Sequence, residues 1–205
     1  MTPFYRMMYF LDRTFCRLGF RLEVEGLEHV PMRSGAILAA NHQSYLDILV
    51  VGASVPRQVT FVARDTLAEW WWLAFVMKRC GAILIRRGTS DRAALRAMSE
   101  HVKEGGLVAI YPEGTRSRDG RTGTFKGGAV LAARAGGVPL VPVGIRGAYE
   151  AWPKGKLLPR PRRILVTFGP PIDPEVEDAT LRLEQSVREL IGDGRFPLRT
   201  PARQG

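Results

Sequence analysis

Short apolar runs alternate with longer amphipathic segments along most of this 205-residue chain, and this alternation constrains the fold more than any other feature. Short apolar runs are typical of buried strands, whereas apolar positions three and four residues apart are typical of helices. Strands that alternate with helices predict an α/β fold, a single layered domain with a largely parallel or mixed sheet flanked by helices. We expect strands at residues 36–40, 59–63, 82–85, 107–111, 140–145 and 164–168, and helices near residues 4–18, 45–54, 66–78, 90–104, 126–135 and 180–191.

Residues 1–20 predict an additional N-terminal amphipathic helix. At about 100° per residue its arginines fall on the side opposite to its apolar stripe. A basic helix with a bulky apolar face is typical of helices that lie at a membrane surface, and the alternative is a helix packed on the domain. We expect a membrane-surface helix at residues 1–20, a main domain at residues 21–192 and a basic flexible tail at residues 193–205. The stripe is Phe4, Met8, Leu11, Phe15 and Leu18, and the arginines are Arg6, Arg13 and Arg17.

Trp70, Trp71 and Trp72 are consecutive and precede another apolar segment. Three consecutive helical residues spread over about 200°, so they cannot all face one core stripe. Tryptophan favours membrane interfaces, which predicts that at least one of the three faces lipid headgroups or a greasy ligand. Packing in the core is an equally weighted alternative.

The charge balance indicates an anionic partner, because 30 lysines and arginines stand against 20 aspartates and glutamates, a net charge of +10. No apolar run approaches the about 18–20 residues that would cross a bilayer. Cys16 and Cys80 form no disulfide framework and suit a reducing, cytosolic compartment. Nucleotide-binding glycine motifs, the serine-hydrolase elbow and zinc spacings are absent from the sequence, and nucleic-acid binding would depend on charge alone.

His42 is the histidine whose surroundings suggest chemistry, because it follows an apolar strand and precedes a helix. Ligand and catalytic groups of α/β sheets lie at such strand ends. If His42 lies in the loop, Asp47 in the first turn of the helix can reach back to the imidazole. The alternative is structural, since Ser44 and Asp47 also form a capping-box pattern.

A second polar cluster follows the strand expected at residues 107–111 and is rich in glycine, hydroxyl and cationic residues. Backbone N–H groups and arginine forks of such a loop can bind a phosphate, and Arg86-Arg87 would add cations at the same sheet edge. For Arg116 we favour phosphate binding over a solvated loop, and for Arg118 and Arg121 the reverse.

Four blocks in this order make the chain resemble the glycerolipid acyltransferase family, nearest to the bacterial 1-acyl-sn-glycerol-3-phosphate acyltransferases. The blocks span about residues 23–150, and no single block would be specific. A local departure lies at residues 63–67, where many relatives carry a Lys-Glu-Leu-like segment. The blocks are Asn41-His42-Gln-Ser-Tyr-Leu-Asp47, Gly81-Ala-Ile-Leu-Ile-Arg86, Tyr111-Pro-Glu113-Gly114-Thr115-Arg116 and Val138-Pro139-Leu-Val-Pro142-Val.

The resemblance implies an enzyme at the cytoplasmic face of the cell membrane, peripherally attached, with residues 21–192 as its acyltransferase domain. It would move a fatty acyl group from acyl-CoA or acyl-carrier protein to the hydroxyl of lysophosphatidic acid, with no cofactor or metal. By the same resemblance His42 is the general base and Asp47 orients it. The acceptor-site residues implied are Arg86, Glu113, Gly114, Thr115, Arg116 and Pro142.

Two alternatives stay open from the residues themselves. The same chemistry could act on another lyso-lipid, including a phosphate-free amino-acid lipid, because arginines bind carboxylates as well as phosphates. A non-catalytic basic module that binds membranes or nucleic acid is the alternative of another class. The coincidence of His42, Asp47 and Glu113 within the four blocks favours the enzyme, with no nucleic acid expected as a partner.

Overall fold

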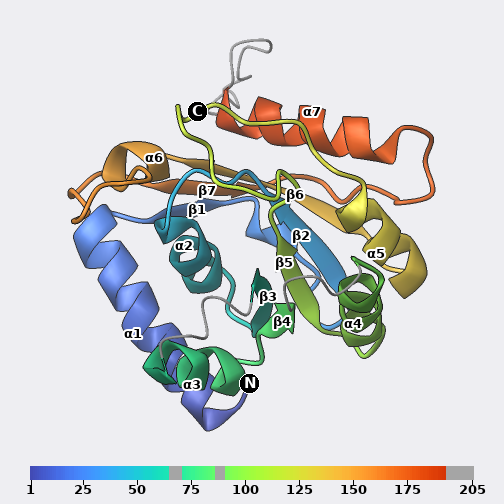
Figure 1. Ribbon diagram of the computed structural model, residues 1–205, viewed down its shortest axis with the longest axis horizontal. Coiled ribbons are helices and arrows are strands. Elements are labelled where there is room, and N and C mark those ends of the chain that lie inside the picture. The colour runs from blue at the N-terminus through green and yellow to red at the C-terminus, as the bar shows by residue number, and fades with distance from the viewer. Residues whose placement is uncertain (65–70, 86–90, 193–205) are drawn as a thin grey trace, which may run out of the picture.

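The computed structural model describes residues 1–64, 71–85 and 91–192, and it forms an α/β layer structure around one twisted sheet (Figure 1). The sheet order is β1-β7-β6-β2-β5-β3-β4. Every neighbouring pair is parallel except β6 with β7, so the expectation of a largely parallel or mixed sheet is confirmed. The strands are β1 (Glu23–Glu25), β2 (Ala36–Ala40), β3 (Val59–Arg64), β4 (Ile83–Ile85), β5 (Leu107–Ile110), β6 (Leu140–Arg146) and β7 (Leu165–Phe168).

Helices cover both faces of the sheet. The first two pack on one face, and α4, α5 and α7 pack on the other (Figure 1). The helices are α1 (Pro3–Phe20), α2 (Leu46–Ser54), α3 (Trp71–Arg79), α4 (Asp91–Lys103), α5 (Gly128–Gly136), α6 (Ala148–Ala151) and α7 (Ala179–Ile191), with a 3-10 turn η1 (Leu27–His29).

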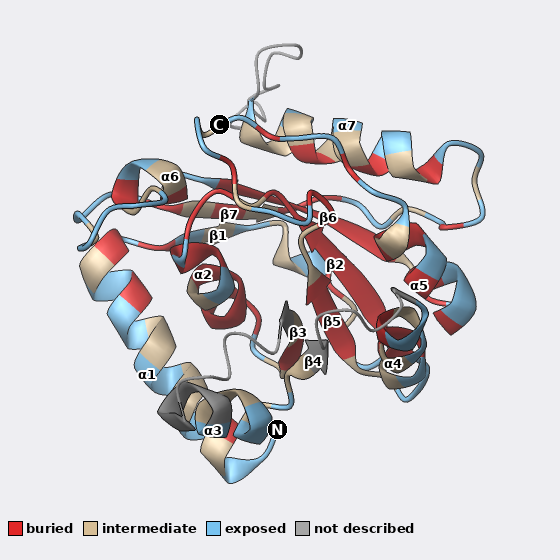
Figure 2. Cartoon of the chain, viewed as in Figure 1, coloured by how far each residue is buried: buried red, intermediate tan, exposed pale blue. Residues whose placement is uncertain are grey.

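The central strand β2 explains why the core has two halves. Its five residues are all buried, and successive side chains of a strand point to opposite faces. Leu38 therefore joins the α1 and α2 side of the core, whereas Ile37 joins the α4, α5 and α7 side. Figure 2 shows the central strands β2, β5 and β6 as mostly buried and the outward faces of the helices as exposed. The continuous apolar pattern of residues 36–40 is thus that of a strand covered on both faces.

The helix α1 packs on the domain through one side and exposes apolar side chains on the other, and its contact with a membrane stays a prediction. Tyr5, Cys16 and Phe20 are buried, and α1 packs along α2. Arg13 donates to the carbonyl oxygen of Ala53 at 2.8 Å, so it contacts the domain. The large apolar side chains left exposed on α1 are Met7, Phe10, Leu11, Phe15 and Leu18, whereas Phe4 and Met8 are half-buried.

Three short elements were not predicted from the sequence. β1 has three residues, two of them exposed glutamates, and becomes a strand by pairing with β7. The other two are η1 and α6, each too short for a periodic pattern. Trp70, the side chains of Trp71 and Trp72, and the tail at residues 193–205 lie outside the described parts of the structure, so the predictions for them stay predictions. None of the helices in the described ranges is both long and apolar enough to cross a membrane.

Candidate active site

The turn between β2 and α2, residues 41–45, brings His42 and Asp47 together. It is called the catalytic turn below, after the role expected of His42. Oδ2 of Asp47 lies 2.8 Å from Nδ1 of His42 and also accepts the backbone N–H groups of Gln43 and Ser44, at 2.7 and 2.8 Å. Asp47 thus holds the turn as a capping residue and holds the imidazole as well. One oxygen atom makes the contacts that the catalytic and the structural interpretation each require, and the catalytic role of Asp47 stays a prediction.

This geometry leaves one imidazole nitrogen available. An ionised carboxylate only accepts hydrogen bonds, so Nδ1 of His42 carries the proton and Nε2 has a free lone pair. Asp47 is fully buried, whereas the His42 side chain is 17% exposed. Asp47 also lies in the first turn of α2, where the positive end of the helix favours a negative charge. A buried anion that holds a partly accessible imidazole in one tautomer is a general-base arrangement.

Tyr111 supports the other side of the imidazole. Its ring is stacked on that of His42, with centroids 4.1 Å apart and an interplanar angle of 18°. Burial and the negative charge of Asp47 raise the pKa of the Tyr111 hydroxyl well above its ordinary value. The phenol therefore stays neutral and serves as a packing surface for the base.

Asn41 fixes the turn to the sheet. Its buried side chain accepts the backbone N–H of Ile145 at 2.8 Å and donates to the carbonyl oxygen of the same residue at 3.0 Å. Ala40 pairs with Val143 at the end of the β2–β6 ladder, and the Asn41 side chain links the next position of the chain to β6 two residues beyond that pair. The catalytic turn therefore starts from a backbone position that the sheet determines.

Glu113 connects the catalytic turn to the loop after β5. Its Oε1 accepts the backbone N–H of His42 at 2.7 Å, and its Oε2 accepts that of Gly123 at 2.8 Å. Burial raises the pKa of this carboxyl, and the two backbone hydrogen bonds oppose the rise. Both oxygens are used within the protein, so Glu113 contributes here by positioning His42, and its predicted contact with the acceptor stays a prediction.

Arg116 lies over the Tyr45 ring, with its guanidinium carbon 3.5 Å from the ring centroid. Among the described residues its Nη1 is a buried donor without a hydrogen-bond partner. Tyr45 is the last residue of the turn that contains His42, and the backbone N–H of Ser117 donates to the carbonyl oxygen of His42 at 2.8 Å, so this guanidinium is held near His42. An arginine in such a place can bind an anion. Gly114 and Thr115 are exposed on the same loop, and Gly114 has a φ of +72°.

One further sequence-predicted residue, Pro142, is not brought into this cluster. Pro142 is buried inside β6, opposite Ala39 of β2, and its carbonyl oxygen accepts the backbone N–H of Gly169 at 2.8 Å. Its place is within the sheet, and its predicted role in acceptor binding stays a prediction. Arg86 lies outside the described residues.

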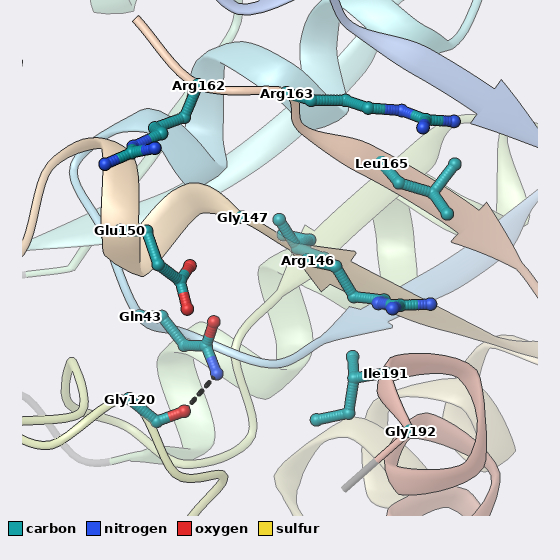
Figure 3. Close-up of a pocket in the computed structure, with 11 residues that line it drawn as sticks. Gln43, Gly120, Arg146, Gly147, Glu150, Arg162, Arg163, Leu165, Ile191 and Gly192 are labelled. Carbon is teal, nitrogen blue, oxygen red and sulfur yellow. Dashed lines mark hydrogen bonds between the residues drawn. The ribbon is translucent and has the colours of Figure 1, made fainter. Parts of the chain in front are cut away.

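An arginine-lined groove of about 920 Å³ adjoins the catalytic turn (Figure 3). Gln43, the residue after His42, lies at one end and donates to the carbonyl oxygen of Gly120. Leu165 and Ile191 contribute apolar surface to the groove. Its charged lining residues are Arg146, Glu150, Arg162 and Arg163.

The sequence analysis assigned no role to Asn41, Tyr45 or Tyr111, which the structure places around His42 and Arg116. Asn41 had one available signal, because an asparagine at the end of a fully apolar strand is a buried polar group that needs partners. For the two tyrosines the contacts are tertiary, and no local pattern indicates them. Within the described ranges no three histidine, cysteine or acidic side chains gather in a way that could hold a metal ion.

Comparisons with known proteins relate this chain to acyltransferases. A family model described as Acyltransferase matches residues 21–146, which include both polar clusters. A chloroplast 1-acyl-sn-glycerol-3-phosphate acyltransferase of Arabidopsis thaliana is 33% identical over 66% of this chain, which spans only 39% of that relative. The Pseudomonas aeruginosa 1-acyl-sn-glycerol-3-phosphate acyltransferase is 30% identical over 93% of this chain and 79% of its own length.

A solved structure shares the fold. The crystal structure of the 1-acyl-sn-glycerophosphate (LPA) acyltransferase PlsC from Thermotoga maritima superposes with a TM-score of 0.76 and 29% sequence identity. The match covers 93% of this chain and 79% of the Thermotoga chain. Together with the family match over residues 21–146, these similarities establish that the chain belongs to the acyltransferase family.

Proposed function

We propose that this protein transfers a fatty acyl group from acyl-CoA or acyl-carrier protein to the free hydroxyl of lysophosphatidic acid, giving phosphatidic acid. The observation that carries the proposal is the 2.8 Å contact between Nδ1 of His42 and Oδ2 of Asp47, which leaves Nε2 free as a base. The names of the similar proteins support the choice of acceptor, since each is a 1-acyl-sn-glycerol-3-phosphate acyltransferase.

The chemistry needs no nucleophile from the protein, because a thioester is already activated. Nε2 of His42 takes the proton of the acceptor hydroxyl while that oxygen attacks the thioester carbonyl carbon. The tetrahedral intermediate then expels the thiolate, and the imidazolium returns the proton to sulfur. Asp47 stabilises the imidazolium between these two proton transfers, and general-base assistance of this kind is worth about 10²–10⁴-fold.

The acceptor phosphate binds at Arg116 in this proposal. Its half-buried side chain is held with the guanidinium plane against Tyr45, so the planar fork has a fixed position in which its N–H groups can donate to a phosphate oxygen. The exposed backbone of Gly114 and Thr115 lies on the same loop and offers further contacts. Binding the phosphate next to the catalytic turn orients the hydroxyl toward His42.

The membrane-surface role of α1 belongs to the same proposal. Its exposed apolar side chains lie on the face turned away from α2, and Arg6 and Arg17 are exposed beside them. Apolar side chains flanked by cations suit the boundary between headgroups and acyl chains. The substrate is itself a lipid, so attachment at this surface would place the enzyme where its acceptor resides.

A thiol-release assay tests the proposed reaction. Acyl-CoA and acyl-carrier protein are offered as donors with lysophosphatidic acid, other lysophospholipids and an amino-acid lyso-lipid as acceptors. We expect acceptor-dependent thiol release with lysophosphatidic acid and a loss of several decades in His42→Ala. His101→Ala is the matched control, since His101 lies on α4 and contacts Thr60. Release with only a phosphate-free acceptor would reassign the substrate, and no release from any pair would overturn the enzyme proposal.

A further inference from the structure

A loop at residues 152–163, between α6 and β7, exposes two adjacent leucines to solvent. Leu157 is 89% exposed and Leu158 is 73% exposed. Exposed leucines scattered singly are ordinary, but two adjacent ones at the end of a loop leave a local apolar patch without a partner. The loop contains cations and no acidic residue, and its cations are Lys154, Lys156, Arg160, Arg162 and Arg163.

The leucine pair is held at the tip of a closed loop. The backbone N–H of Arg160 donates to the carbonyl oxygen of Ala151 at 2.8 Å and so closes the base. Inside it, the indole N–H of Trp152 donates to the carbonyl oxygen of Lys156 at 2.8 Å. The exposure of the leucines therefore results from a hydrogen-bonded loop conformation.

The same loop is fixed to the catalytic turn. The hydroxyl of Ser44 donates to the carbonyl oxygen of Trp152 at 2.8 Å, and Ser44 forms an isolated bridge with Pro153. The rings of Tyr45 and Trp152 lie 5.3 Å apart. Because Tyr45 also carries the guanidinium of Arg116, the loop tip has a defined position relative to the proposed acceptor site.

The loop and α1 lie on one flank of the molecule. Ile164, just after the loop, donates its backbone N–H to the carbonyl oxygen of Phe20 at the end of α1, at 3.0 Å. In Figure 1 the loop extends beside this end of α1, and the last turns of α1 carry Phe15 and Leu18, which are 50% and 82% exposed. Figure 2 shows the exposed loop on the side away from α4, α5 and α7.

We propose that Leu157 and Leu158 insert into the interfacial region of an anionic lipid bilayer, while the exposed Lys154, Lys156 and Arg160 of the loop contact its headgroups. Arg163 is paired with Glu23 and takes no part in this contact. Charge complementarity and the exposed end of α1 on the same flank identify a lipid surface as the occupant. The loop and α1 then contact the bilayer at two separated points, which sets the orientation of the catalytic turn to the membrane. The lipid contact stands without the proposed acyl transfer, whereas its use for taking up a lyso-lipid rests on that function.

A fluorescent probe tests the contact directly. Leu157→Cys is labelled with a polarity-sensitive dye in a Cys80→Ser background, because Cys16 is buried. The matched control is Leu181→Cys, at a 52% exposed leucine of α7 on the opposite sheet face. With vesicles of phosphatidylcholine and phosphatidylglycerol we expect a blue shift and an intensity rise at position 157 alone. Vesicle binding of the labelled protein without any change at position 157 would overturn the proposal.

A charge substitution tests the energetic contribution. Leu157→Asp combined with Leu158→Asp should weaken vesicle sedimentation about tenfold or more, because two aspartates cannot enter the apolar boundary and are repelled by anionic lipid. Leu131→Asp with Leu181→Asp is the control, at exposed leucines of α5 and α7, which are 53% and 52% exposed. Unchanged melting temperature checks the fold. Equal sedimentation of the two double variants would refute the contact.

The two proposals fail in different ways. If the chain shows no thiol release but position 157 responds to vesicles, acyl transfer fails and the lipid contact stands. If turnover of a soluble short-chain acceptor is normal and position 157 does not respond, acyl transfer stands and the lipid contact fails. If the leucine variants impair only reactions with acyl-carrier protein and leave sedimentation unchanged, the loop binds the donor protein and the lipid proposal is wrong.

Discussion

Asp47→Asn is the substitution that tests the catalytic turn most sharply, because one oxygen of Asp47 performs two tasks. Oδ2 accepts from Nδ1 of His42 and from the backbone N–H groups of Gln43 and Ser44, whereas Oδ1 is buried without a partner among the described residues. An asparagine in this site keeps its carbonyl oxygen at the Oδ2 position, where three donors converge. The tautomer of His42 is then preserved, and what is lost is the negative charge.

The size of the effect follows from that charge. Opposite unit charges about 4 Å apart interact by about 4 kcal/mol at an effective dielectric constant of about 20. In the transition state the proton is partly transferred, so about half to all of this interaction energy stabilises it. Loss of that stabilisation should lower kcat about 30- to 1000-fold. The new amide N–H₂ replaces the unpartnered Oδ1, and a buried donor without a partner costs about 1–3 kcal/mol. A melting temperature a few degrees lower should accompany the loss of rate.

Initial rates of thiol release, measured with saturating donor and acceptor, provide the assay. Asp178→Asn is the matched control, because Asp178 is exposed and its left-handed conformation, with φ of +56°, suits asparagine. In a His42→Ala background Asp47→Asn should add less than about threefold, since it acts through the imidazole. A loss below threefold in the wild-type background would mean that Asp47 only caps the turn, and the assignment of His42 as base would lose its support.

Substitutions at three further positions probe other contacts. Arg116→Ala should raise KM for lysophosphatidic acid about tenfold or more and leave KM for the donor nearly unchanged, and Arg116→Lys should recover only part, because lysine lacks the planar fork stacked on Tyr45. The opposite pattern in initial rates would refute phosphate binding there. Asn41→Ala should lower the free energy of unfolding by about 2–4 kcal/mol in denaturant titrations, because it leaves the buried N–H and carbonyl groups of Ile145 without their hydrogen-bond partner. A loss below about 0.5 kcal/mol, typical of a surface substitution, would contradict this. Burial raises the pKa of Asp12 from 3.8 to about 7, so the folded protein retains a proton that the unfolded chain has released, and stability should fall as the pH rises from about 4 to about 7. Asp12→Asn should remove this slope and be more stable at pH 8 by on the order of 2 kcal/mol, discounted for the partial exposure of Asp12; identical unfolding curves of both proteins from pH 4 to 8 would exclude the effect.

The elements of the main sheet could be predicted because their determinants are local. Residues 36–40 match β2 at both ends, since a run of five apolar residues bounded by Gly35 and Asn41 has one favourable backbone solution, a strand buried on both faces. Boundaries shift by one or two residues where packing intervenes, as at Leu107–Ile110 of β5. β1 could not be predicted, because its short, charged sequence becomes a strand only through its pairing with β7.

At the candidate site, too, local contacts could be predicted and tertiary contacts could not. The five-residue spacing of His42 and Asp47, placed across a strand end and a helix start, is a local property, and the sequence alone predicted that the carboxylate reaches the imidazole. The link from Glu113 to the backbone of His42 spans 71 residues of chain, and that from Asn41 to Ile145 spans 104. No periodicity contains such contacts, because they arise when β2, β5 and β6 align side by side in the sheet.

The sequence by itself therefore determined that this chain is an α/β protein of the acyltransferase family with a histidine and an aspartate in one turn and an apolar, basic N-terminal helix. Only the tertiary structure decided which side of α1 stays exposed, that Tyr45 carries Arg116, and that the loop with Leu157 is fixed beside the catalytic turn. The physical reason is the distance along the chain over which each of these effects acts. Backbone geometry and side-chain periodicity act over a few residues, whereas exposure and contact depend on which segments distant in the chain the packed sheet brings together.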